Sequence, residues 1–368
     1  MRVGLVTTSY PRWRGDAAGS FVAGHAAYLR RTGAAVEIVA AGAPDVDAAW
    51  DRAEGVTRIA APTGLFYAGG APEALARGAT GGAAGFVARL TAAVAVRARR
   101  WDAVAAHWLA PSAWAALATR GPLLAIAHGG DVHLLAQRRL LGPTLRALAL
   151  RGARVACVSS AARDAVRAAY PRAQPLVQPM GVDDDATAAI IAARAARPPA
   201  SPITIAILAR LVPIKGLDVA LAALAQLPAR CTLVVAGDGP ARAALEHRAA
   251  ALGVSARVRF VGWLDAAARD ALLAAADAVC VPSIATPDGR SEGTPLAALE
   301  ALAAGVPTVV TATGGLAALA SHGAHVVPPG DPAALAAAII TAITTPTTPC
   351  RDLGWAIVGP RLDAHWRR

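Results

Sequence analysis

The chain has 368 residues, which is more than one simple core needs and favours two domains. Hydrophobic residues make up 55% of the chain and aromatic residues 4%, so its core must consist of closely spaced helices and strands. The net charge of +11 favours polyanionic partners, either anionic lipids or phosphorylated substrates. Nucleic acid is disfavoured, because no run of basic residues is interleaved with aromatic ones.

Short β-rich segments alternate with helical segments rich in Ala and Leu along the whole chain. Many of the β-rich segments are apolar without alternation, which is typical of strands buried on both faces. Strands that alternate with helices predict parallel, doubly wound sheets. The expected strands are residues 2–6, 35–40, 56–59, 103–107, 123–127, 154–158, 203–208, 231–236, 257–261, 278–282, 307–310 and 324–327.

The strand pattern restarts at Ile203, directly after the Pro-rich stretch 195–202, which is typical of a linker. We therefore expect an α/β protein of two Rossmann-like domains, residues 1–182 and 183–354, that face each other across a cleft. In such sheets, ligands bind in the loops at the carboxyl ends of the strands.

A reduced, cytoplasmic environment is expected from the cysteines and from the N-terminus. Three of the four cysteines lie in apolar segments and none is close to another, which favours buried thiols. The chain enters a strand at Arg2, so no signal peptide is expected. Segment 134–154 carries five arginines among leucines, and two interpretations stay open: a basic face on anionic lipid or a solvated helix. The cysteines are Cys157, Cys231, Cys280 and Cys350, and the five arginines are Arg138, Arg139, Arg146, Arg151 and Arg154.

The segment Ser291–Gly305 contains two of the six glutamates of the chain, Glu292 and Glu300. Thr294 is a good N-cap and Pro295 suits a first helical turn, so Glu292 is expected before a helix and Glu300 within it. The free N–H groups near Leu296 and Ala297 would then favour a phosphate.

Of the 36 basic residues, only Lys215 is a lysine, and it follows the expected strand 203–208 together with Arg210. A loop that carries two cations at the carboxyl end of a strand suits a diphosphate, because Arg grips two oxygens and Lys reaches a third.

Two histidines, His107 and His128, end neighbouring strands of the first half. A histidine at a strand end is more often structural than catalytic, but two of them at adjacent strand ends favour a functional role. Gly129 and Gly130 would let a ligand approach the backbone next to His128.

Together these motifs resemble family 4 of the glycosyltransferases, which are retaining enzymes of the GT-B fold. The resemblance runs nearly from end to end. It is most specific in the second half, in R-L-V-P-x-K-G, G-D-G-P, V-R-F-V-G-W-L, the segment Asp288–Pro307 and V-P-P-G-D-P. It is looser in the first half, in the S-Y-P loop with G-D-x-A-G, H-G-G-D-V-H and P-M-G-V-D.

The resemblance implies a role for each matching residue. Arg210 and Lys215 would hold the donor diphosphate, Glu292 the sugar hydroxyls and Glu300 the ribose hydroxyls. His128 would lie near the reacting carbon, and a C-terminal helix, 355–366, would return to the first domain. The remaining donor-binding residues would be Gly15, Gly19, Trp263, Leu264, Gly293, Thr294, Pro295, Leu296 and Ala297, and residues on the acceptor side would be Asp16, His107 and Asp131.

Some positions depart from the family pattern. No acidic residue follows Gly314 and Gly315, Ala209 stands where Gly is usual, and Ile214 stands where an acidic residue is common. The first departure concerns the loop after the donor site, and no proposed cation or glutamate is lost.

The expected function is retaining transfer of a hexosyl group from a UDP- or GDP-sugar to an acceptor hydroxyl, in cell-envelope polysaccharide or glycoconjugate synthesis. Transfer without a metal is expected, because Asp183, Asp184 and Asp185 are better explained as a solvated turn than as a metal site. Two alternatives stay open: a sugar-nucleotide epimerase on the same fold, and an inactive partner subunit. Peripheral contact with an anionic membrane is also left open.

Overall fold

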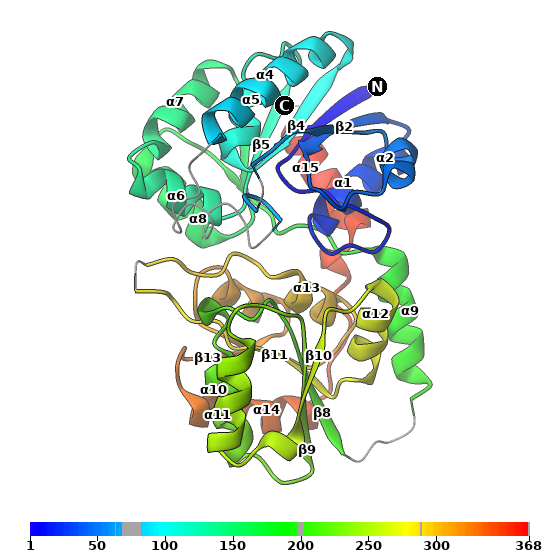
Figure 1. Cartoon of the computed structure of the whole chain (residues 1–368), viewed down its shortest axis with the longest axis vertical. Coiled ribbons are helices and arrows are strands. Elements are labelled where there is room, and N and C mark those ends of the chain that lie inside the picture. The colour runs from blue at the N-terminus through cyan, green and yellow to red at the C-terminus, as the bar shows by residue number, and fades with distance from the viewer. Residues whose placement is uncertain (63, 68–81, 198–201, 288, 367–368) are drawn as a thin grey trace. The chain divides into compact units, whose positions relative to one another are not determined.

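The computed structural model describes residues 1–62, 64–67, 82–197, 202–287 and 289–366 (Figure 1). The chain divides into two compact units, and each is described by itself. The first unit comprises Met1–Gly181 with Trp355–Arg368, and the second comprises Val182–Gly354. Part of the expected linker, residues 198–201, lies outside the described residues.

Each unit is built on one parallel sheet. The strand order is β3-β2-β1-β4-β5-β6-β7 in the first unit and β10-β9-β8-β11-β12-β13 in the second. All of the expected strands are confirmed with ends within one residue, and the short β7 was not expected. The strands are β1 (Arg2–Val6), β2 (Ala35–Ala41), β3 (Val56–Ile59), β4 (Ala103–His107), β5 (Leu123–Ala127), β6 (Arg154–Cys157), β7 (Leu176–Val177), β8 (Ile203–Leu208), β9 (Cys231–Ala236), β10 (Val258–Gly262), β11 (Ala278–Val281), β12 (Thr308–Thr311) and β13 (His325–Val327).

Helices connect the strands, as a parallel sheet requires. In the first unit they are α1 (Ser20–Arg31), α2 (Ala48–Glu54), α4 (Ala83–Arg97), α5 (Trp114–Ala116), α6 (Gly130–Gln137), α7 (Leu141–Leu150), α8 (Ser160–Ala169) and α15 (Trp355–Trp366). In the second unit they are α9 (Asp184–Ala195), α10 (Leu217–Gln226), α11 (Arg242–Ala251), α12 (Ala266–Ala275), α13 (Leu296–Ala303) and α14 (Pro332–Thr344).

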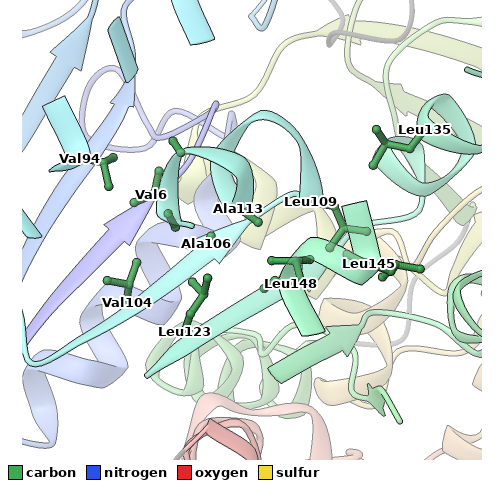
Figure 2. Packing of buried hydrophobic residues seen from close by; sticks show 14 of the residues in the cluster. Val6, Val94, Val104, Ala106, Leu109, Ala113, Leu123, Leu135, Leu145 and Leu148 are labelled. Atoms are coloured by element: carbon green, nitrogen blue, oxygen red, sulfur yellow. The ribbon is translucent and has the colours of Figure 1, made fainter. Parts of the chain in front are cut away.

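Both sheets are covered on both faces, which explains why their strands do not alternate between apolar and polar residues. In β4, Val104 and Ala106 belong to one core cluster, whereas Ala103 and Ala105 belong to the cluster on the opposite face. Figure 2 shows the first of these clusters, where residues of β1, β4 and β5 meet side chains of α4 and α7. Successive side chains of a strand point to opposite faces, so residues of both parities along β4 enter a core.

The strand order of each sheet reverses at one point, between β1 and β4 in the first unit and between β8 and β11 in the second. The loops that leave the carboxyl ends of these neighbouring strands diverge and leave room for a ligand. Most candidate residues of the sequence follow these strands, so each unit has its candidate site near its own reversal point, whereas His128 follows β5 and Trp263 follows β10.

Helix α15 packs beside α1 in the first unit (Figure 1). Its first residue, Trp355, is 1% exposed and fits against two glycines. A Cβ on Gly24 would lie 2.3 Å from the indole of Trp355, and one on Gly181 would lie 2.5 Å from it. The hydroxyl of Tyr28 donates a hydrogen bond of 3.0 Å to Asp363, which fixes the far part of α15.

Segment 134–154 is not one continuous amphipathic helix. Helix α6 ends at Gln137, α7 begins at Leu141, and Arg139 between them has a φ of 56°. Arg151 is part of the fold, because its guanidinium donates to the carbonyl groups of Thr119 and Gly121. Within the described ranges, no helix combines the length and the apolar character that crossing a bilayer requires.

We expect Gly24→Ala to lower the stability of the protein, because the added methyl group meets the buried indole of Trp355. Overpacking of this kind costs about 1–3 kcal/mol, which thermal unfolding would report as a lower Tm. Gly85→Ala is the matched control, since Gly85 also lies in a helix but its added methyl group meets only the flexible end of Arg89. Equal melting temperatures for the two variants would contradict the proposed packing of α15.

Candidate active site

In the second unit, the site begins at the carboxyl ends of β8 and β11, which are adjacent parallel strands. The loop after β8 carries Arg210 and Lys215, and the loop after β11 leads through Ser283 to Glu292. Two backbone contacts join the loops. The N–H of Ile284 donates to the carbonyl oxygen of Ile214 at 2.9 Å, and a Cβ on Gly216 would lie 2.0 Å from the carbonyl oxygen of Pro282.

Lys215 and Glu292, which the sequence predicted on the donor side, form an ion pair. The distance between Lys215 Nζ and Glu292 Oε2 is 2.5 Å, and the hydroxyl of Ser283 donates to the same oxygen at 3.2 Å. Their side chains are 19% and 16% exposed, so the pair is partly desolvated but still open to a ligand. Ser283 was not predicted, although its place after a buried strand is a usable signal.

A backbone contact from the loop after β12 fixes the position of Glu292. The N–H of Gly315 donates to the carbonyl oxygen of Glu292 at 3.0 Å. Gly314 has a φ of 54°, and a Cβ there would lie 1.9 Å from the same oxygen. The paired glycines after β12 therefore hold the Glu292 loop through backbone alone. Asp288, at the start of the motif, lies outside the described residues.

Helix α13 begins at Leu296, with Pro295 as its N-cap. The prediction that Thr294 caps this helix is therefore wrong by one residue, because the extended backbone of Pro295 occupies the cap position. The first N–H groups of the helix, at Leu296 and Ala297, lie where the helix dipole favours an anion. Gly293 and Thr294 lie in the half-buried loop before it.

Glu300 lies inside α13, as predicted, and pairs with a residue that the sequence did not reveal. Arg269 Nη1 on α12 lies 3.2 Å from Glu300 Oε1. Burial raises the pKa of Glu300, and the positive charge of Arg269 opposes this shift. Arg269 was not predicted, because arginine is so common in this chain that its presence at a position does not indicate a functional site.

Trp263 and Leu264 follow β10 at the same edge of the second sheet. The side chain of Trp263 is 54% exposed. An exposed indole at the carboxyl edge of a sheet offers a flat face for a ring, and its contact with the donor remains a prediction.

In the first unit, the loop after β1 is organised by Asp16. The Arg12 guanidinium donates to Asp16 at 2.7 Å, and the backbone N–H groups of Arg12 and Ala18 donate to the same carboxylate. Gly19 has a φ of 72°, and a Cβ there would lie 2.4 Å from the carbonyl oxygen of Ser9, so the two ends of the loop that contains Gly15 lie close together.

Asp131 joins the loops after β4 and β5. Its carboxylate accepts hydrogen bonds from the N–H groups of Leu109 at 2.6 Å and of His128 at 3.0 Å. Burial raises the pKa of Asp131, and these backbone hydrogen bonds oppose the shift.

The residues expected on the acceptor side are all buried. Asp16, His107 and Asp131 are 2%, 0% and 5% exposed, and each is engaged with protein groups. The structure therefore assigns them to the support of the site, because an acceptor cannot reach a fully enclosed side chain such as His107.

His128 is the end of a row of three histidines. His25 Nδ1 lies 3.0 Å from His107 Nε2, and His107 Nδ1 lies 3.1 Å from His128 Nε2. His128 is half-buried, with its ring 4.9 Å from that of Phe21 and 4.8 Å from that of Trp108. Sequence reasoning missed His25, because a buried histidine on a helix face looks like any core position.

The three aspartates at 183–185 form a helix start. Asp183 is the N-cap of α9, and its carboxylate accepts hydrogen bonds of 2.9 Å from the N–H groups of Asp185 and Ala186.

Two family profiles match this chain. The profile described as "Glycosyltransferase Family 4" matches residues 18–186, and the one described as "Glycosyl transferases group 1" matches residues 192–354. A curated relative, the putative colanic acid biosynthesis glycosyltransferase WcaL of Escherichia coli, is 31% identical over 201 residues, which are 54% of this chain and 48% of the relative. The match thus spans about half the length of that relative.

Solved structures show the same fold over the whole chain. The sucrose-phosphate synthase of Thermosynechococcus elongatus has a TM-score of 0.74 at 20% identity, covering 100% of this chain and 98% of that one. Anabaena HepE, in complex with UDP, has a TM-score of 0.67 at 22% identity with the same coverage. Because the two profiles together match nearly the whole chain and the fold agrees, the chain belongs to the family 4 glycosyltransferases of the GT-B fold.

Proposed function

We propose that the protein transfers a hexosyl group from a nucleoside-diphosphate sugar to an acceptor hydroxyl with retention of the anomeric configuration. The observation that carries this proposal is the Lys215–Glu292 pair beside the N-terminus of α13. A ligand that combines a sugar with a diphosphate suits this edge of the sheet. The cation and the first N–H groups of the helix favour the diphosphate, and the carboxylate can bind sugar hydroxyls.

In the proposed reaction, the bond between the anomeric carbon and the diphosphate oxygen breaks, and its electron pair leaves on the diphosphate. The acceptor oxygen forms the new bond to the same carbon, and its proton is released. Lys215, Arg210 and the N–H groups of Leu296 and Ala297 would stabilise the negative charge where it develops. Glu292 would bind sugar hydroxyls, and Glu300 would bind those of the ribose.

The known relatives support this proposal. HepE was solved with UDP, and WcaL is named for colanic acid biosynthesis, which supports a nucleotide-sugar donor and a role in envelope polysaccharide synthesis. The base of the donor is proposed to be uracil or guanine. The free cysteines, three of them buried, support a cytoplasmic location.

We further propose peripheral contact with anionic lipid through exposed residues of segment 134–154. Arg138, Arg139 and Arg146 are exposed, and Leu140 and Leu150 beside them are 42% and 81% exposed. Arg151 takes no part, because its guanidinium binds the backbone of its own unit.

If the proposed function is correct, the protein will release UDP or GDP when it is incubated with the matching nucleotide sugar and a hydroxyl acceptor. A panel of UDP-, GDP- and ADP-sugars would identify the donor, and we expect turnover to continue in EDTA because the proposed cations are side chains. Accumulation of epimerised donor would instead indicate an epimerase. Absence of binding to every nucleotide sugar would indicate an inactive subunit, and activity lost in EDTA and restored by Mg²⁺ would contradict the metal-free mechanism.

We expect Lys215→Met to lower kcat by about 10²-fold or more, as the loss of one preorganised charge-stabilising group does. Lys215→Arg keeps the charge, but a guanidinium is larger than an ammonium group and holds its donors in a rigid planar fork, so a smaller loss of kcat is expected. Steady-state kinetics would measure both, with the exposed Arg248→Met as the control for loss of a cation. Wild-type kinetics in Lys215→Arg would refute a specific role for the ammonium group.

Replacing Arg138, Arg139 and Arg146 together by Gln is expected to weaken binding to anionic vesicles, since each basic residue near such a surface contributes about 1 kcal/mol. Co-sedimentation with vesicles of increasing phosphatidylserine content would measure this. The control replaces the exposed Arg248 and Arg259 of the second unit by Gln. Binding that does not depend on the anionic lipid would refute the proposed contact.

A further inference from the structure

The three histidines of the first unit are linked through both nitrogens of the middle ring. His107 Nε2 faces His25 Nδ1 at 3.0 Å, and His107 Nδ1 faces His128 Nε2 at 3.1 Å. The rings come from α1, from the end of β4 and from the residue after β5. His25 and His107 are both fully buried.

All three rings are expected to be neutral at pH 7. Burial lowers the pKa of each of them, and the mutual repulsion of the imidazolium forms adds to this effect for His107 and His128. A neutral imidazole has one N–H donor and one bare acceptor nitrogen. His107 must therefore donate through one nitrogen and accept through the other, so both hydrogen bonds run in the same direction along the row.

The environment of His25 determines in which direction the two hydrogen bonds run. Its Nε2 is buried and has no hydrogen-bond partner among the described residues. The ring stacks on the indole of Trp355, with centroids 5.2 Å apart and an angle of 7° between the planes. If His128 donated to His107, His25 Nε2 would carry a buried N–H without an acceptor, which is rare in folded proteins. A bare nitrogen at this position avoids that cost.

We propose that His25 and His107 are positioning residues that hold His128 in the tautomer with the proton on Nδ1. In this direction, His25 donates to His107 and His107 donates to His128, so that Nε2 of His128 is occupied and its Nδ1–H is left as a donor. The opposite direction would leave Nδ1 as an acceptor.

The chemical consequence concerns the ligand of His128. A diphosphate oxygen of a nucleotide sugar carries no proton at pH 7, so it can accept a hydrogen bond but cannot donate one. A sugar hydroxyl can do both, so it too can accept a hydrogen bond from an N–H group. A fixed Nδ1–H therefore suits oxygens of the sugar and diphosphate of a donor. This inference rests on the proposed function for the identity of the ligand, but the tautomer itself does not depend on it.

The tautomers can be measured by long-range ¹H–¹⁵N correlation of the imidazole rings in the full chain at pH 7. A protonated and a bare ring nitrogen have well-separated ¹⁵N shifts, and a ring without a fixed tautomer shows averaged ones. We expect a protonated Nδ1 and a bare Nε2 in His25, His107 and His128. The exposed His247 is expected to show averaged shifts, and the single variants His25→Phe, His128→Phe and His247→Gln would assign the signals. A protonated Nε2 or averaged shifts for His128 in the wild-type protein would overturn the proposal.

A pair of variants at His107 then tests the effect on the reaction. His107→Phe removes both hydrogen bonds, so His128 is expected to show averaged shifts and kcat/KM to fall about two- to tenfold, as for the loss of one oriented hydrogen bond. His107→Asn retains one acceptor and one donor, and it is expected to restore the fixed tautomer and part of the loss. The proposal would also be overturned if the ring nitrogens of His128 kept their wild-type ¹⁵N shifts in a folded His107→Phe variant. Absence of turnover with every nucleotide sugar would contradict the proposed function alone, because the shifts of the wild-type protein are measured without substrate.

Discussion

The close approach of Gly216 to the carbonyl oxygen of Pro282 is the contact on which the site of the second unit depends. No side chain fits between these two backbones, since a Cβ on Gly216 would lie 2.0 Å from the oxygen. The loop that carries Lys215 is thereby held against the loop that leads to Glu292. The ion pair of 2.5 Å between their side chains is thus placed by backbone packing, and two flexible side chains meet at a defined point.

Two other loops are held by the same kind of close contact between a glycine and a carbonyl oxygen. Gly314 approaches the carbonyl oxygen of Glu292, and Gly19 approaches that of Ser9. Backbone contacts of this kind need no side chain from the loop itself. The side chains of the loops are therefore left to serve the ligand or to form the ion pairs and hydrogen bonds that surround it.

The sequence was sufficient for the strands and for the loops that carry Lys215 and Glu292, because both leave local patterns. Apolar segments without alternation identify strands buried on two faces, and Lys215 and Glu292 lie in the loops that follow two such strands. What the sequence could not reveal are partners from distant elements. Arg269 meets Glu300 from another helix, and His25 lies 82 positions from His107. Strand β7 has only two residues, too few to carry a pattern.

Three side chains that are expected to contact the donor share one property: each is held by a partner before any ligand arrives. Glu292 is paired with Lys215, Glu300 with Arg269 and His128 with His107. A long side chain that is already ordered in the free protein loses little further rotamer freedom when a ligand binds. Ordering a free side chain on binding would cost about 0.5–1.5 kcal/mol. The pairing also restricts the mechanism. Glu292 already occupies one side of the Lys215 ammonium group, at 2.5 Å. A diphosphate that binds Lys215 must therefore share the ammonium group with Glu292. This is possible because an ammonium group has three N–H donors, of which Glu292 takes one.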